Sequence, residues 1–277
     1  MSKLYIVGTP IGNLGDLSSR AIQVLNSVDF VAAEDTRVAM KFLNHFEIKK
    51  PLISYFEQNI RQRGQIIVDR ILQGENCAIV TDAGMPCISD PGEDLVKLCY
   101  QQKIPMEVVP GPSAVISALA ISGQSTSRFC FEGFLPTNKK SRMDLLAEIS
   151  HHRETLVFYE APHKLLRTLQ DMLAALGDRR ISVCKELTKI HESVLLTTLS
   201  GAVQYFQENT PRGEYVLVIE GYIQPEEKAM SLQQAIELAA DKKAQGMSAK
   251  EAAKFAAEIS GYKKNQIYAG LMEQNNS

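Results

Sequence analysis

The chain has 277 residues, of which 45% are hydrophobic and 22% are charged, and its formal net charge is −2. This apolar content supports folded domains with real cores and argues against a disordered chain. The near-neutral charge excludes a protein that holds nucleic acid by a global basic excess, so any such contact must come from local basic patches.

The five cysteines are scattered, and no two of them form a Cys-x-x-Cys pair. This pattern is typical of a reducing compartment and favours neither a disulfide framework nor a zinc site, so we expect a cytoplasmic protein without a metal. A strand-like segment opens the chain, and no stretch approaches ~18 consecutive apolar residues, so no membrane span is expected. The cysteines are Cys77, Cys87, Cys99, Cys130 and Cys184.

Residues 1–123 alternate between short apolar runs and amphipathic segments, which predicts an α/β domain with a mainly parallel sheet. A helix is expected from Asp16, as its cap, to Val28, and a second from about Glu57 to Gln73. Asp90-Pro91-Gly92-Glu93 predicts another helix start, with a cap followed by proline at the first helical position. Strands are expected at 3–8, 29–33, 52–54, 77–81 and 106–109.

Residues 124–224 predict a second α/β domain, followed by a linker near 223–230 and a helical module at 231–277. In that module Ser248 and Glu251 form a capping box, and Lys263 and Lys264 open the following helix. The second domain is expected to have strands near 128–134, 155–159, 181–186, 193–198 and 215–221, with helices near 141–150, 162–176 and 199–208.

Three loops rich in glycine and proline follow strands of the first domain, at 8–15, 81–92 and 110–114. None has the Gly-x-Gly-x-x-Gly or phosphate-loop pattern, and Pro10 removes an amide that a phosphate cradle would use. Ligands of open α/β sheets bind at the carboxyl ends of the strands. The loops therefore predict a crevice for a bent nucleoside-type ligand, although ordinary turns remain an alternative for each.

Several motifs occur together and in order, and with them the chain resembles the ribosomal RNA methyltransferases of the tetrapyrrole-methylase superfamily, the class III methyltransferases. There are two departures: Met85 replaces a more common threonine, and Lys164 stands where arginine is more common. The motifs are Val7-Gly8-Thr9-Pro10-Ile11-Gly12-Asn13-Leu14, Ala33-Glu34-Asp35-Thr36-Arg37, the 82–92 loop, Gly133-Phe134-Leu135-Pro136, Tyr159-Glu160-Ala161-Pro162-His163 and Glu186-Leu187-Thr188-Lys189.

The resemblance implies a two-domain tetrapyrrole-methylase-like fold with a ligand cleft between the domains and a small helix–turn–helix RNA-binding module after them. It implies a homodimer that uses S-adenosylmethionine to methylate the ribose 2′-hydroxyl of a cytidine in the decoding centre of 16S ribosomal RNA. The cofactor contacts that it implies are Pro10, Gly84, Ile88, Ser113 and Ala114.

A ribose hydroxyl is a weak nucleophile, so a base or a cation near the developing alkoxide should assist the transfer. Lys189 or Arg37 is expected to stabilise the oxyanion, and a carboxylate to take the proton. The carboxylate candidates are Glu160 and Glu186, with Glu34, Asp35 and Glu214 and the imidazole of His163 as further possibilities. The residues expected to dock RNA are Lys139, Lys140, Arg142, Lys263 and Lys264.

Two other functions fit the same patterns. The first is a superfamily enzyme that methylates a tetrapyrrole or a protein side chain, which should not need a basic helical tail. The second is a non-catalytic module that senses a nucleoside in the cleft and holds RNA with the tail, which would bind the cofactor without turnover.

Overall fold

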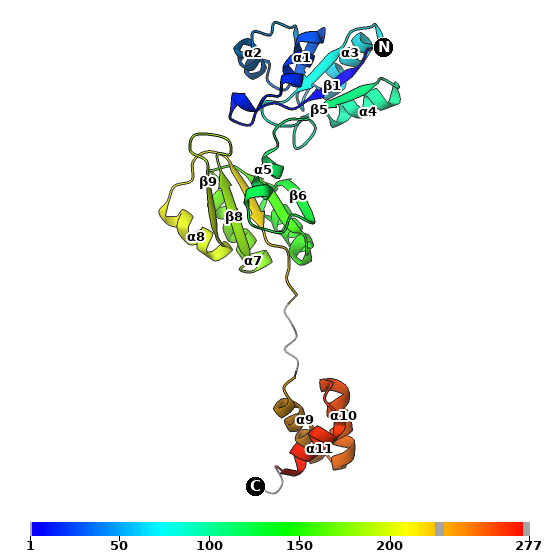
Figure 1. Cartoon of the computed structure of the whole chain (residues 1–277), viewed down its shortest axis with the longest axis vertical. Coiled ribbons are helices and arrows are strands. Elements are labelled where there is room, and N and C mark those ends of the chain that lie inside the picture. The colour runs from blue at the N-terminus through cyan, green and yellow to red at the C-terminus, as the bar shows by residue number, and fades with distance from the viewer. Residues whose placement is uncertain (1, 225–229, 274–277) are drawn as a thin grey trace. The chain divides into compact units, whose positions relative to one another are not determined.

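The computed structural model describes residues 2–224 and 230–273, and the chain forms two compact units, Met1–Tyr222 and Ile223–Ser277. Residues 225–229, which make up most of the predicted linker, lie outside the described residues, as do residues 1 and 274–277. The first unit contains two five-stranded sheets, and the second contains three helices (Figure 1). The predicted α/β fold is thus confirmed.

The first sheet is entirely parallel, with the order β3-β2-β4-β1-β5. Every residue of β2 and β4 is buried, as expected for a parallel sheet that is covered on both faces. Because β1 lies between β4 and β5, the loop that follows β1 lies next to the loops that follow both neighbours. The strands are β1 (Leu4–Val7), β2 (Phe30–Ala33), β3 (Leu52–Ser54), β4 (Cys77–Val80) and β5 (Met106–Val109).

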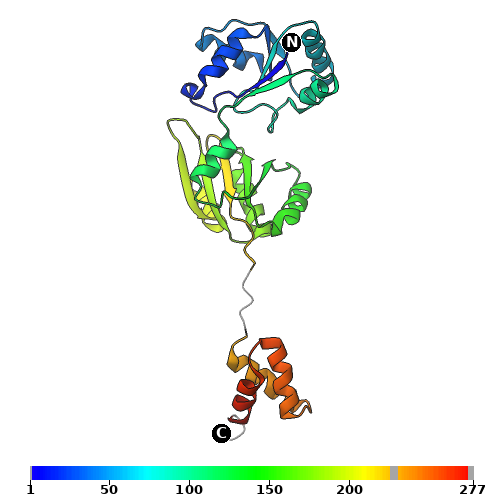
Figure 2. The same ribbon diagram turned by 45° about the vertical axis from the view of Figure 1, so that its right-hand side comes forward.

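Helices cover both faces of this sheet (Figures 1 and 2). Helices α1 (Ser19–Ser27) and α2 (Thr36–His45) pack on the face that carries Val31 and Ala33. Helices α3 (Ile60–Leu72) and α4 (Glu93–Gln101) pack on the opposite face, which carries Phe30 and Ala32. The alternation of buried residues along β2 therefore serves two separate cores.

Two predicted helix starts are wrong. Ser18 caps α1 by accepting a hydrogen bond from the Ala21 amide, whereas Asp16 ends a short 3-10 turn (Leu14–Asp16). Helix α4 begins at Glu93 after Gly92, whose φ of 140° favours glycine, and it has no side-chain cap. Asp90 instead belongs to a loop whose side chains line a cavity.

The second sheet has the order β6-β7-β10-β8-β9, in which only β6 and β7 are parallel to each other. Helices α6 (Lys139–Glu148), α7 (Leu165–Leu176) and α8 (Leu199–Glu208) contribute to the core on one face. The strands are β6 (Phe129–Phe134), β7 (Thr155–Glu160), β8 (Arg180–Lys185), β9 (Ser193–Thr198) and β10 (Tyr215–Ile219).

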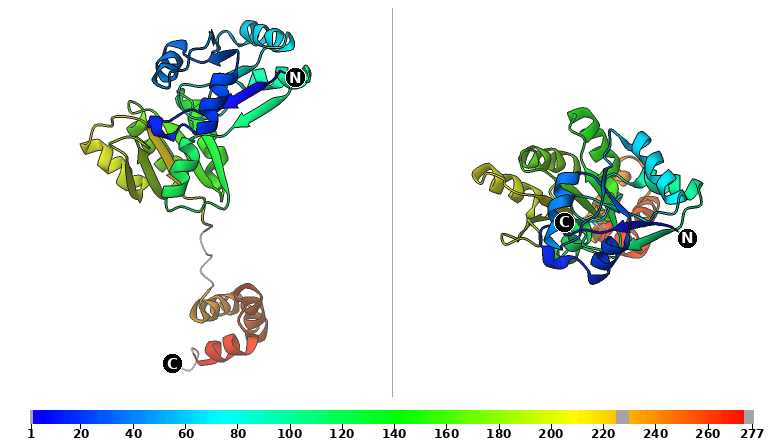
Figure 3. Two further views of the ribbon diagram at one scale, coloured as in Figure 1. Left: turned by 45° about the horizontal axis from the view of Figure 1, so that its top comes forward. Right: turned by 90° about the horizontal axis from the view of Figure 1, so that it is seen from above.

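Helix α5 (Ala114–Ile121) covers the other face of the second sheet. The predicted domain boundary at residue 123 would place this helix in the first domain. Its buried residues Val115, Ala118 and Leu119 pack against a cluster that includes Val157 and Val218. The helix follows the loop after β5, so it connects the carboxyl edge of the first sheet directly to the face of the second (Figure 3).

Arg142 lies at the contact between α6 and α7 and is only 4% exposed. Its guanidinium donates to Asp171 Oδ2 at 2.8 Å and to the carbonyl oxygens of Pro136 and Thr137. This burial argues against the prediction that Arg142 contacts RNA, because its guanidinium holds the loop after β6 and does not face solvent. Lys139 and Lys140, at the start of α6, are exposed.

The second unit is a bundle of α9 (Leu232–Ala244), α10 (Ala249–Ser260) and α11 (Lys264–Glu273). The predicted capping box at Ser248 is confirmed, and Ser231 forms a second one. Gly261 ends α10 in a left-handed conformation (φ 74°), which explains the sharp turn before Lys263 and Lys264. In the described part of the chain, we find no helix with the length and apolar character to cross a membrane.

The Arg142 contact predicts a large loss of stability for Asp171→Ala. The variant leaves a buried guanidinium without its carboxylate, so the free energy of unfolding should fall by about 3–5 kcal/mol. Urea unfolding followed by circular dichroism measures this change. The matched control is Asp144→Ala, an exposed carboxylate on α6, which should change stability by less than about 0.5 kcal/mol. Equal stabilities for the two variants would contradict the assignment.

Candidate functional site

Two adjoining cavities lie within the first unit. The first, here called the Asp90 cavity, has a volume of about 390 Å³ and is lined from both sheets. The second, here called the His45 cavity, has a volume of about 460 Å³ and lies against the loop after β1 and helix α2. Ile11, Asp82, Ala83 and Glu214 line both, so two ligands that occupy the cavities would be neighbours.

The three predicted loops are held together by their backbones. The amides of Thr9 and Gly84 donate to each other's carbonyl oxygens at 2.8 and 3.2 Å, and the Thr9 hydroxyl donates to Thr81 O. A Cβ atom on Gly8 would lie 2.7 Å from the Gly111 backbone, so only glycine allows this approach. The amide of Gly84 is thus already used within the protein, and Gly84 can offer a ligand its surface but not that donor.

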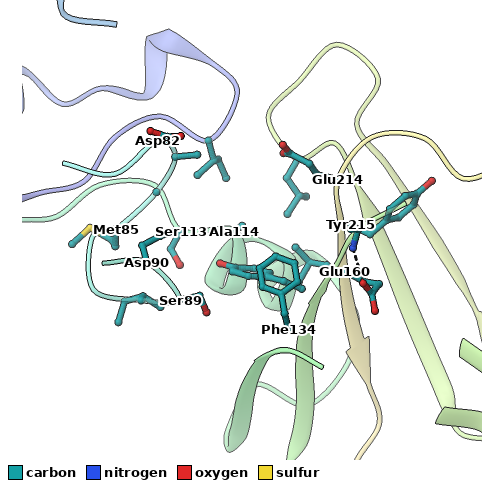
Figure 4. Close-up of a pocket in the computed structure, with 18 of the residues that line it drawn as sticks. Asp82, Met85, Ser89, Asp90, Ser113, Ala114, Phe134, Glu160, Glu214 and Tyr215 are labelled. Atoms are coloured by element: carbon teal, nitrogen blue, oxygen red, sulfur yellow. Dashed lines mark hydrogen bonds between the residues drawn. The ribbon is translucent and has the colours of Figure 1, made fainter. Parts of the chain in front are cut away.

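Figure 4 shows the residues of the Asp90 cavity converging from the two sheets. The first sheet contributes the loop with Asp82, Met85 and Asp90, and Ser113 and Ala114 follow β5. Phe134 and Tyr159, at the ends of β6 and β7, face them from the second sheet, and their ring centroids are 5.4 Å apart. Apolar and aromatic groups therefore stand opposite a polar loop.

The loop between β4 and α4 has an unusual backbone. Cys87 and Ser89 have φ angles of 72° and 61°, in the left-handed region that non-glycine residues seldom adopt. Backbone strain of this kind persists only where the surrounding structure imposes it, and it concentrates at ligand sites. The loop turns Ser89 and Asp90 toward the cavity (Figure 4).

The charge in the Asp90 cavity is negative. Burial, and then the nearby carboxylate of Glu34, raises the pKa of Asp90 to about 6. Burial also raises the pKa of Asp82, and Glu34 accepts a hydrogen bond from the Thr81 hydroxyl at 2.8 Å. Among the described residues that line this cavity there is no lysine, arginine or histidine. The cavity therefore favours a cationic ligand and disfavours a nucleotide with several phosphates.

The His45 cavity brings basic side chains beside two carboxylates that it shares with the Asp90 cavity. Lys41 and His45 come from α2, and Lys189 comes from the connection between β8 and β9. Lys189 Nζ donates to Glu186 Oε1 and to Glu214 Oε2, both at 2.9 Å, and its methylene chain lies against Gly12, where a Cβ atom would be 2.6 Å from Cγ. Burial alone lowers the pKa of Lys189, but these two carboxylates raise it above its usual value, so Lys189 is a fixed cation.

The predicted cofactor contacts divide between the cavities. Gly84, Ile88, Ser113 and Ala114 line the Asp90 cavity, whereas Pro10 lines the His45 cavity. The side chain of Ser113 caps α5 by accepting a hydrogen bond from the Ile116 amide, at 3.5 Å. Ser113 thus joins this wall of the cavity to the helix that packs on the second sheet.

The predicted catalytic residues are only partly brought together. Lys189 and Glu186 are paired, but Glu160 is 5% exposed and accepts hydrogen bonds from the Thr168 hydroxyl and the Ala161 amide. Arg37 is 86% exposed, pairs with Asp35 two residues away and lines neither cavity. Their catalytic roles stay predictions, with Lys189 in the most suitable position.

Sequence reasoning missed the role of Asp90, which it interpreted as a helix cap, and did not single out Asp82 or Phe134. Part of the signal was present, because Glu34 and Asp82 each directly follow a predicted strand, and Asp90 lies in the same loop as Asp82. What could not be seen was that β2 and β4 are neighbours, which brings the carboxylates to one edge of the sheet.

Comparisons with known proteins agree with this geometry. The family model described as "Tetrapyrrole (Corrin/Porphyrin) Methylases" matches residues 3–203, and that described as "RsmI C-terminal HTH domain" matches residues 243–275. The chain is 43% identical over 274 residues to ribosomal RNA small subunit methyltransferase I of Synechocystis sp., with 99% of this chain and 98% of the relative covered. It is 44% identical to the protein of that name from Halalkalibacterium halodurans, with 96% and 93% covered.

A solved structure supports the fold independently. The cobalamin biosynthetic enzyme cobalt precorrin-4 methyltransferase superposes with a TM-score of 0.59 at 17% identity, covering 79% of this chain and 94% of the other. Identity at this level supports a common fold and no more.

The raised pKa of Asp90 predicts that Asp90→Asn stabilises the protein at neutral pH. A folded-state pKa of about 6, above the usual 3.8, means that the folded state holds this proton more tightly, so stability falls as pH rises between these values. At pH 7.5 the variant should be more stable by about 1–3 kcal/mol, and below about pH 4 the difference should vanish. Urea unfolding at both pH values measures it.

The control is Asp94→Asn, an exposed carboxylate at the start of α4. Its effect should stay below about 0.5 kcal/mol at both pH values. A destabilised Asp90→Asn protein at pH 7.5, or a gain that is independent of pH, would contradict the electrostatic account.

Proposed function

Because the chain belongs to the family of ribosomal RNA small subunit methyltransferase I, we propose that it transfers a methyl group from S-adenosylmethionine to a ribose hydroxyl of small-subunit ribosomal RNA. In the finer form of the proposal, the acceptor is the 2′-hydroxyl of a cytidine in the decoding centre of 16S RNA. The observation that carries the proposal is the pair of adjoining cavities, of which one is lined, among the described residues, by carboxylates without a basic side chain and the other adds Lys41 and Lys189.

The Asp90 cavity suits the methyl donor. Its volume of about 390 Å³ lies in the usual range for small-molecule sites. Asp82 and Asp90 complement the sulfonium and ammonium charges of S-adenosylmethionine, and Phe134 offers an exposed aromatic surface to a flat base. When bound, the donor supplies an already activated methyl group, so the protein's principal task is alignment, worth up to ~7–11 kcal/mol.

The His45 cavity suits the acceptor nucleotide. Its basic side chains complement a phosphate backbone, and the loop with Pro10 and Gly12 presents little side-chain bulk to an incoming ribose. Glu214 reaches both cavities and is 79% exposed, which allows it to accept a proton from a hydroxyl at their junction. Lys189, held by Glu186 and Glu214, can stabilise negative charge on that oxygen.

Further contacts are proposed for the rest of the RNA. The exposed Lys139 and Lys140, and Lys263 and Lys264 in the second unit, offer cations to phosphates. A homodimer and an RNA-docking role for the tail follow from the resemblance, and the match of residues 243–275 supports the latter. This tail also favours an RNA substrate over a tetrapyrrole or a protein side chain.

The central prediction is that the protein incorporates labelled methyl groups from S-adenosylmethionine into ribose of unmethylated 30S particles. Lys189→Ala should lower kcat by about 10²–10³-fold, as loss of an oxyanion-stabilising donor does, without weakening cofactor binding. Arg37→Ala tests the other predicted cation in the same assay. Lys97→Ala, on the exposed side of α4, is the control and should keep full activity.

Three results would speak against the proposal. Cofactor binding without any incorporation would support the non-catalytic alternative. Incorporation into a tetrapyrrole or a protein but not into RNA would support another superfamily activity. Wild-type turnover by both Lys189→Ala and Arg37→Ala on saturating RNA would remove the proposed electrostatic role.

A second prediction concerns the tail. A chain that ends at residue 224 should bind S-adenosylmethionine as the full chain does, because the residues lining both cavities lie before Tyr222. Its affinity for the small subunit should fall. In the full chain, Lys263→Ala with Lys264→Ala should reduce the slope of log affinity against log salt by about 1–2. Calorimetry and filter binding provide the measurements, and lost cofactor affinity in the truncated chain would be the contrary result.

A further inference from the structure

Three potential metal ligands meet at the amino-terminal ends of β6 and β7. Cys130 is the second residue of β6, His152 follows the short 3-10 helix Ile149–His151, and Glu154 directly precedes β7. The thiol, an imidazole nitrogen and a carboxylate oxygen of these residues all lie within 4.8 Å of one another. In the part of the chain that the structure describes, no other group of three His, Cys, Asp or Glu side chains has its ligand atoms this close together.

This cluster is distant from the proposed methyl-transfer site. Phe134, which lines the Asp90 cavity, ends the same strand on which Cys130 lies near the start. Three residues of β6 lie between them, so about 13 Å of strand separates the two positions. Tyr159 likewise lies near the end of β7, whereas Glu154 precedes its start. The inference below therefore does not rest on the proposed function.

One ring nitrogen of the histidine in the cluster lacks a hydrogen-bond partner among the described residues. His152 Nδ1 is buried and makes no hydrogen bond to any described residue. The backbone around it is fixed, because its amide donates to Ile149 O and its carbonyl accepts from the Tyr222 amide at 2.6 Å. A buried nitrogen without a partner costs free energy. A ligand at this position would remove that cost.

The other two groups can also serve as ligands. Glu154 Oε1 accepts from Arg128 Nη2 at 2.7 Å, but Arg128 is 81% exposed and can turn toward water. A glutamate side chain is a carboxylate at neutral pH, which is the form that binds a metal. The Cys130 thiol is half-buried and would release its proton to solvent as it bound a metal.

We propose that Cys130, His152 and Glu154 bind a divalent cation of the zinc class, with water as the fourth ligand. A thiolate, an imidazole and a carboxylate are the ligands that zinc prefers, and the ion favours a tetrahedral arrangement. Bond lengths of about 2.0–2.3 Å place tetrahedral ligand atoms about 3.3–3.8 Å apart. Small side-chain rotations bring ligand atoms that already lie within 4.8 Å to that spacing.

The bound ion would tie together three segments. It would join the edge strand β6 to the connection before β7 and, through the His152 carbonyl, to Tyr222 at the end of the first unit. Arg179 already reinforces this region by donating to Ser150 O and lying over the Tyr222 ring. The site is thus a structural clamp at the end of the second sheet that is remote from both cavities.

The test uses full-length, tag-free protein kept reduced by a phosphine. One titration adds Co²⁺ directly. A second measures Zn²⁺ affinity by competition with a chromophoric chelator. Wild-type protein should bind one equivalent and show a thiolate-to-cobalt charge-transfer band in the near ultraviolet. Cys130→Ser should abolish the band, and His152→Asn and Glu154→Gln should each weaken zinc binding by at least about tenfold. Zinc should also raise the Tm of the wild-type protein.

His151→Asn is the matched control, since His151 is the adjacent, exposed histidine, and it should bind like the wild type. Circular dichroism and S-adenosylmethionine binding verify that the variants are folded. A wild-type protein without the cobalt band, or a Cys130→Ser variant that retains it, would overturn the proposal. Equal loss of zinc binding in His151→Asn and His152→Asn would do the same.

Discussion

The arrangement of the site depends on one close approach between backbones. Strand β1 lies between β4 and β5, and the loop that follows it contacts both neighbouring loops. Gly8 and Gly111 are so close that neither tolerates a Cβ atom, and Thr9 and Gly84 exchange a pair of backbone hydrogen bonds. These contacts give loop amides and carbonyl oxygens the hydrogen-bond partners that water would otherwise supply, and they leave side chains to face the ligand. They also determine where α5 begins.

From that point α5 crosses to the second sheet, and its packing against β7 and β10 holds Phe134 and Tyr159 opposite the loops. Among the described residues, the same arrangement places basic side chains in only one of the two cavities. Carboxylates at the ends of β2 and β4 gather in one cavity, whereas Lys189 enters the next cavity from the second sheet. Glu214 borders both, so groups of opposite charge meet where the two proposed substrates would meet.

The candidate metal cluster illustrates a limit of reasoning from spacing. The scattered cysteines, without a Cys-x-x-Cys pair, predict no metal, and the adjacent His151 and His152 cannot both serve as ligands from one helix face. Cys130 and Glu154 are brought together by the parallel pairing of β6 with β7, in which Cys130 is opposite Leu156. Local sequence contains no record of such a pairing, because it depends on which strands become neighbours.

By itself, the sequence determined the alternation of strands and helices, the three loops at strand ends, the capping box at Ser248 and the family, because these depend on local periodicity, turn chemistry and ordered motifs. Only the tertiary structure decided that Arg142 is buried against Asp171, that Asp90 lines a cavity and does not cap a helix, and that Arg37 is exposed and lines neither cavity. The physical reason is that burial and charge environment are properties of neighbours in space. Strand order and helix packing determine which residues become neighbours, and these residues come from segments far apart in the chain.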